Sequence, residues 1–262
     1  VVRTLEERQR RAGHALLGEL ASEGIRVADW SDLSQARRKW LRKHYLRNIY
    51  PLVTPQATDP AHPFPFISNL SLNLLVTLRY PDDEHTLVAR VKVPVGAGIP
   101  RLVRAGDASV WVPLESVMAN NLDLLFPGMK ILSCEVFRVT RNAIYDVDED
   151  MADDLLELME AGLRKRKLAP IVRLQVAQGF DANRLQMLTS VLGLREADVF
   201  EGDGLTGLRD LMGDASARPS RAQGSSPSPL RPPDLLTDRP IFDIVREEGP
   251  ILLHHPYKVF NT

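Results

Sequence analysis

Two segments with alternating apolar residues most constrain how this chain can fold. In the first, residues 70–80, every second residue is Leu, Val or Tyr, and residues 87–93 also place an apolar residue at every second position. A period of two is typical of a β-strand with one buried face. The polar sequence PDDE at 81–84 lies between the two segments, so they are predicted to form an antiparallel hairpin.

Further short apolar segments predict more strands, interleaved with helical patterns. Strands are predicted at 101–104, 110–113, 131–140, 172–176 and 198–201. Helices are predicted at 114–126, 148–167, 181–192 and 205–212. The predicted fold class is therefore α+β, with a mixed, largely antiparallel sheet, packed helices and a helical hairpin before them.

The helical hairpin is predicted from the first 50 residues. Apolar residues recur at helical spacing over 5–20, and Gly24 closes that pattern. Ser31 or Ser34 can begin the second helix, and Pro51 stops it.

The second predicted helix is strongly basic. Between Ser34 and Tyr50 it has no acidic residue, and its lysines and arginines are Arg37, Arg38, Lys39, Arg42, Lys43 and Arg47. They are interpreted either as a rim that attracts phosphate groups or as a solvated helix face whose last cations complement the helix dipole.

Charge and composition limit the classes of function. The formal net charge of the 262 residues is −1, so any anion site must be local. No apolar run approaches the ~20 residues that cross a bilayer. The single cysteine, Cys134, lies in an apolar strand and is predicted to be a buried structural thiol, as is typical of a reducing compartment.

Familiar catalytic and metal-binding motifs are missing from the sequence. There is no phosphate loop, no dinucleotide fingerprint and no nucleophile with a recognisable triad. His254 and His255 are adjacent, which is not the spacing of zinc ligands, and the acidic residues at 148–154 are interpreted as the start of a helix. No catalytic residue and no metal ligand is therefore predicted.

Arg138 and Arg141 are the candidate site residues. They lie three residues apart where the strand predicted at 131–140 ends. Arginine is suited to bidentate phosphate binding, which makes the two side chains a predicted phosphate site. The alternative is an ordinary ion pair with the acidic residues that follow.

Several motifs resemble, in the same order, the long bacterial polyphosphate kinase family (ATP–polyphosphate phosphotransferases). They are FPFISNLSLNLLV (64–76), ARVKVP (89–94), VPLESVMANNLDLLFPG (112–128), EVFRVTRNA (135–143), LRKRK (163–167), VRLQV (172–176) and IFDIVREEGPILLHHPYKVF (241–260). The resemblance implies the end of an N-terminal helical domain at 1–50 and an α+β head (middle) domain at 51–213. It also implies the start of a truncated catalytic domain at 239–262. The Pro/Ser-rich composition of 214–238 predicts a linker before that domain.

The resemblance also implies a function for the parent enzyme. Such an enzyme transfers the terminal phosphate of ATP reversibly to inorganic polyphosphate through a phosphohistidine, with ATP and Mg²⁺ bound in the full enzyme. The catalytic histidine belongs to a domain that this sequence lacks, so the chain is expected to be a fragment that binds neither cofactor and is inactive alone.

Its implied roles are homodimer contacts and part of the wall of the nucleotide and polyphosphate tunnel. The implied location is cytoplasmic, with membrane association through a complex as an option, and no nucleic-acid partner is expected. The alternative is a non-catalytic module for dimerisation or polyphosphate binding.

Overall fold

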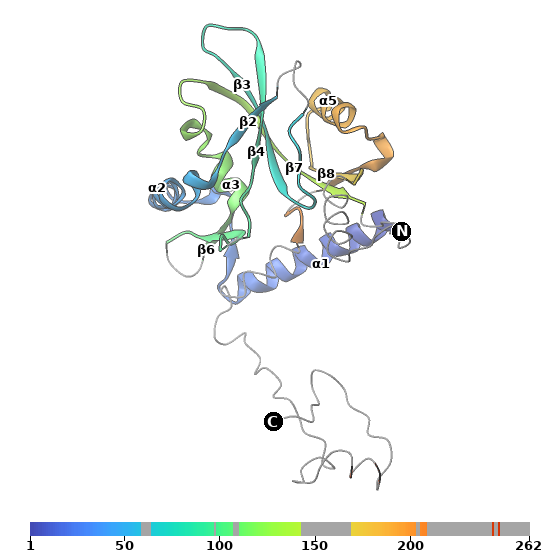
Figure 1. Ribbon diagram of the computed structural model, residues 1–262. Coiled ribbons are helices and arrows are strands. Elements are labelled where there is room, and N and C mark those ends of the chain that lie inside the picture. The colour runs from blue at the N-terminus through green and yellow to red at the C-terminus, as the bar shows by residue number, and fades with distance from the viewer. Residues whose placement is uncertain are drawn as a thin grey trace. The chain divides into compact units, whose positions relative to one another are not determined.

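A computed structural model describes residues 1–58, 64–96, 98–106, 110–142, 169–202, 205–208, 243 and 246 (Figure 1). The chain divides into two compact units, Val1–Asp214 and Ala215–Thr262. All the helices and strands given below belong to the first unit. In the second unit the described residues are Asp243 and Arg246, which form an ion pair with an N···O distance of 3.4 Å.

A six-stranded sheet forms the centre of the first unit. Its strand order is β2-β4-β3-β7-β8-β9, and only the β8–β9 pair among these is parallel. The strands are β2 (Pro55–Thr58), β3 (Leu72–Arg79), β4 (Thr86–Lys92), β7 (Lys130–Arg141), β8 (Ile171–Ala177) and β9 (Val199–Gly202). The predicted α+β class and the predicted β3–β4 hairpin are confirmed.

A smaller sheet lies beside the first one. It has the order β1-β6-β5, where β1 (Arg26–Val27) pairs in parallel with β6 (Val110–Pro113), and β5 (Leu102–Arg104) pairs with β6 in the antiparallel sense. Helix α3 (Leu114–Ala119) follows β6 directly. Because α3 follows the small sheet directly, it packs on one face of the large sheet.

Helices pack on both faces of the large sheet (Figure 1). The remaining α-helices are α1 (Val2–Ser22), α2 (Gln35–His44) and α5 (Ala182–Leu192). Helix α2 begins at Ser34, whose side chain accepts a hydrogen bond from the backbone N–H of Arg37, and it continues as a π-helix over Tyr45–Ile49. Helix α5 begins at Asp181 and ends at Gly193, which adopts the left-handed conformation of a C-cap.

The alternation of β3 produces two hydrophobic cores. Leu74 and Val76 point to the face that packs with Leu41 of α2 and with α3, whereas Leu75 belongs to the core on the opposite face, with Leu188 of α5. All five of these residues are fully buried. Successive side chains of a strand point to opposite faces, so one strand contributes to both cores.

Two features of the fold differ from the prediction, and several predicted elements lie outside the described residues. No strand was predicted between Pro51 and residue 70, but β2 forms there at the edge of the sheet, where its first residue, Pro55, is tolerated. The helix predicted at 114–126 ends at Ala119, and a 3-10 turn over Leu122–Leu124 follows. The helix predicted at 148–167, most of that at 205–212, and the linker at 214–238 lie outside the described residues.

Candidate functional site

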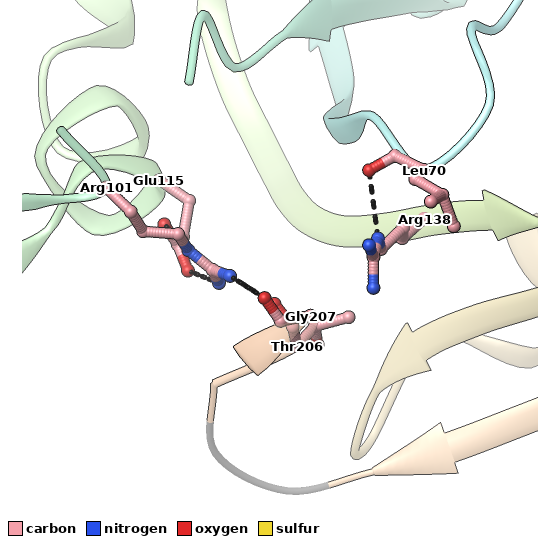
Figure 2. Close-up of polar contacts among 6 residues, drawn as sticks. All are labelled: Leu70, Arg101, Glu115, Arg138, Thr206 and Gly207. Atoms are coloured by element: carbon pink, nitrogen blue, oxygen red, sulfur yellow. Dashed lines mark hydrogen bonds and ion pairs between the residues drawn. The ribbon is translucent and has the colours of Figure 1, made fainter. Parts of the chain in front are cut away.

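Arg138 lies in the middle of the large sheet. It faces Leu72 in β3 and Gln175 in β8, and only 6% of the residue is exposed. Its Nε donates a hydrogen bond of 2.9 Å to the carbonyl oxygen of Leu70 (Figure 2). On the other side, the guanidinium group lies against the backbone of Gly207.

Arg101 approaches the same backbone from the small sheet. Its side chain is fully buried and forms an ion pair with Glu115 of α3 through both carboxylate oxygens. Its Nη1 donates hydrogen bonds to the carbonyl oxygens of Thr206 and Gly207, the second at 3.0 Å. Figure 2 shows that Arg101 and Arg138 reach residues 206–207 from two directions.

We call Arg101, Glu115 and Arg138 the arginine clamp. A buried cation is stable only when it is paired or surrounded by hydrogen-bond acceptors. Glu115 supplies the opposite charge for Arg101, and main-chain carbonyl groups supply the acceptors. The clamp therefore fixes the chain at 206–207 against both sheets.

Arg141 holds a different part of the chain. Its Nε and Nη2 donate to the carbonyl oxygen of Ile67 at 3.0 and 2.9 Å, and its Nη1 donates to the carbonyl oxygen of Ala169 at 2.7 Å. The guanidinium group also lies 4.7 Å from the ring centroid of Phe66, and burial lowers the pKa of Arg141. Arg141 therefore joins the loop before β3 to the start of β8.

Arg138 and Arg141, the two residues predicted to bind phosphate, thus form hydrogen bonds with different parts of the backbone. A register shift in β7 falls between Thr140 and Arg141, and the described hydrogen bonds of Arg138 and Arg141 go to different carbonyl groups. The structure gives each arginine an architectural role. Their binding of phosphate stays a prediction.

Helix α2 lines a pocket of about 560 Å³. Arg42 donates to both carboxylate oxygens of Asp123, at 2.9 and 2.6 Å, and to the side-chain oxygen of Asn121 at 2.9 Å. The hydrogen bond from Arg42 lowers the pKa of Asp123, and the same bond raises the pKa of Arg42. The lining residues are Trp30, Gln35, Ala36, Arg38, Lys39, Arg42, Asn120 and Asn121.

Other chemistry is limited in the part of the chain that the structure describes. Among the described residues, no group of three or more His, Cys, Asp or Glu side chains could hold a metal ion. Among the same residues, no helix is long and apolar enough to cross a membrane. Cys134 is half-buried, and burial together with the nearby Glu135 raises the pKa of its thiol to about 12.

Comparison with known proteins places this structure in a family. The family profile of the polyphosphate kinase middle domain matches residues 36–213. The chain belongs to the polyphosphate kinase family. The predicted resemblance is thereby confirmed. The matched region contains the arginine clamp, Arg141 and the α2 pocket except for Trp30 and Gln35.

The relatives are themselves polyphosphate kinases. The chain is 42% identical to the polyphosphate kinase of Synechocystis sp. over 275 residues, which cover 95% of this chain and 38% of the relative. It is 39% identical to that of Mycobacterium ulcerans, covering 95% of this chain and 35% of the relative. For that of Aphanizomenon baltica, also 39% identical, the shares are 92% and 69%. The chain thus spans little more than a third of the first two polyphosphate kinases.

A solved structure supports the fold. The crystal structure of polyphosphate kinase from Porphyromonas gingivalis matches with a TM-score of 0.72 and 22% sequence identity. The match covers 98% of this chain and 38% of that chain. At this identity the likeness concerns the fold alone.

Two members of the arginine clamp were not predicted from the sequence. Arg101 and Glu115 both stand beside apolar residues, in PRLV and VPLESVM. A charged residue bordered by predicted core positions is the signal that could have indicated a buried pair. Nothing in the sequence indicates that Arg101 also binds the backbone at 206–207.

Proposed function

We propose that this chain supplies the middle domain of an enzyme that transfers the terminal phosphate of ATP reversibly to inorganic polyphosphate. The match of the middle-domain profile over residues 36–213 carries this proposal. Transfer proceeds through a phosphohistidine outside this chain, with ATP and Mg²⁺ bound in the whole enzyme. The enzyme is cytoplasmic.

This chain, with α1 before its middle domain, contributes architecture and electrostatics to that enzyme. We assign it contacts in a homodimer and part of the wall of the path along which nucleotide and polyphosphate move. Exposed apolar residues on α1 support the first role, since Leu5 is 56% and Leu16 is 58% exposed. The cations of α2 support the second, because a positive surface attracts phosphate chains.

A domain exchange tests the proposal. In the Synechocystis polyphosphate kinase, the segment that aligns with residues 36–213 is replaced by those residues of this chain, and synthesis of polyphosphate from ATP is measured. We expect activity in the exchanged enzyme and none in the same enzyme with the segment deleted. A folded exchanged enzyme that forms no polyphosphate would contradict the proposal.

The 262-residue chain by itself provides a second test. We expect it to form no polyphosphate from ATP and Mg²⁺, because its sequence presents no predicted nucleophile. Synthesis by the purified chain would refute our assignment of the phosphohistidine to another domain. An inactive exchanged enzyme together with a dimeric 262-residue chain in gel filtration would favour the alternative, a non-catalytic dimerisation module.

A further inference from the structure

We propose that the α2 pocket binds a run of linked phosphate groups, such as those of inorganic polyphosphate or of a nucleoside triphosphate. The inference deepens the proposed function and rests on it, because both proposed substrates carry linked phosphates. The sequence alone predicted only a basic helix here and no ATP binding by this chain. The inference departs from that expectation, because the side chains of the pocket can bind the phosphate groups of a nucleoside triphosphate.

The first support is the charge of the lining. Arg38, Lys39 and Arg42 line the pocket, and none of its lining residues is Asp or Glu. Residues at i and i+4 of a helix lie on the same face, about one turn apart, so Arg38 and Arg42 present their cations in a row. A chain of phosphates offers negative charges in a row as well.

The second support is that the guanidinium groups are held in place. Arg38 donates from Nε to the carbonyl oxygen of Trp30 at 3.1 Å and from Nη2 to that of Ser31 at 2.6 Å. Arg42 is fixed by Asn121 and Asp123. Side chains that are already ordered lose little conformational entropy when a ligand binds.

Lys39 is the third support. It is exposed, and among the residues that the structure describes its ammonium group has no hydrogen-bond or ion-pair partner. Asp123 offsets much of the charge of Arg42, so Arg38 and Lys39 provide most of the attraction for an anion. Two substitutions should therefore have opposite effects on anion binding. Replacing Lys39 removes an attracting charge, whereas replacing Asp123 removes a repelling one.

The size of the pocket favours more than one phosphate group. Its volume of about 560 Å³ lies within the roughly 300–1,000 Å³ of pockets that hold small-molecule ligands. A single inorganic phosphate would leave most of that space to water. Linked phosphates can contact Arg38 and Lys39 at the same time.

Calorimetric titration of the 262-residue chain with tripolyphosphate tests the inference. We expect binding that weakens as salt is added, because exposed charges are screened. Lys39→Ala should lower the affinity by roughly five- to tenfold, as expected for the loss of one nearby charge. Asp123→Asn should raise the affinity, since the charge of Arg42 is then no longer offset.

Lys43→Ala is the matched control. Lys43 is exposed on the same helix and carries the same charge, but it does not line the pocket. We expect this substitution to change the affinity by less than about twofold. Equal losses in the Lys39 and Lys43 variants, or no binding of tripolyphosphate to the unmodified chain, would overturn the inference. Circular dichroism establishes that each variant is folded.

Titration with ATP separates the two sources of linked phosphates. Binding of both ATP and tripolyphosphate, with the same loss in Lys39→Ala, supports a site for the phosphate run itself. Binding of ATP alone would overturn it, because recognition would then require the base. If the exchanged enzyme makes polyphosphate while this chain binds no tripolyphosphate, only the inference fails; an inactive exchanged enzyme with intact binding contradicts only the proposed function.

Discussion

Gly207 lies directly against the guanidinium group of Arg138. A Cβ added to Gly207 would be 2.8 Å from Nη1 and 2.9 Å from Cζ of Arg138, and Gly207 has a φ of +75°. Gly207→Ala should therefore lower the free energy of unfolding by about 2–4 kcal/mol, through backbone strain and displacement of a buried cation. Urea denaturation measures this loss.

Gly24→Ala separates the two causes. Gly24 has a similar φ of +84°, but a Cβ there would meet no atom within 4 Å. Its substitution should cost only the backbone strain, about 1–2 kcal/mol. Equal losses at positions 24 and 207 would show that contact with Arg138 adds nothing.

Removing Glu115 should strongly destabilise the first unit. Glu115→Ala removes the carboxylate that binds the fully buried guanidinium group of Arg101 through two hydrogen bonds, which costs about 3–5 kcal/mol. Thermal and urea denaturation both report this change. For comparison, Glu7→Ala removes the exposed pair with Arg11 and should alter stability by no more than about 0.5 kcal/mol. Similar losses in the two variants would contradict the buried role of Glu115.

Cys134 should resist alkylation in the folded protein. Because burial raises the pKa of its thiol to about 12, almost no thiolate is present at pH 8. We expect iodoacetamide to react about a thousandfold more slowly than with the unfolded chain, and the rate to keep rising with pH well above 9. Reaction at the same rate in buffer and in concentrated urea would disprove the protection.

The hydroxyl group of Tyr45 should be dispensable. It is buried, it has no hydrogen-bond partner among the described residues, and burial raises its pKa. Tyr45→Phe removes a polar group that lost its water on folding, so stability should stay the same or rise by up to about 1 kcal/mol. A clear loss of stability, measured by urea denaturation, would indicate that the hydroxyl group is satisfied after all.

The strand pattern of the fold follows from the sequence because alternation is a local property. The strand predicted at 110–113 has the bounds of β6, and that predicted at 131–140 is one residue shorter at each end than β7. Strand β2 was missed because its sequence, PQAT, has too few apolar residues to show a period. Its position depends on pairing with β4, which a local pattern does not contain.

The clamp could be predicted only in part, for a similar reason. Arg138 is recognisable as an arginine in an apolar strand, but its neighbour Gly207 lies 69 positions further along the chain. The carbonyl groups that Arg101 and Arg141 bind carry no side-chain signal at all. The sequence therefore pointed to Arg138 and Arg141 but not to their backbone partners, and phosphate binding by these two arginines stays a prediction.

The order of pairing in the large sheet also bears on how the chain folds. Strands β3 and β4 are joined by a short turn and can pair as soon as Lys92 has left the ribosome. Strand β3 must then wait for β7, since Leu72 pairs with Arg138, 66 residues later. Closing so long a loop is slow compared with forming a hairpin. During synthesis, one edge of β3 therefore stays unpaired while about forty further residues are added. Until β7 arrives, this exposed edge is the part of the sheet that can most easily pair with a strand of another chain and start aggregation.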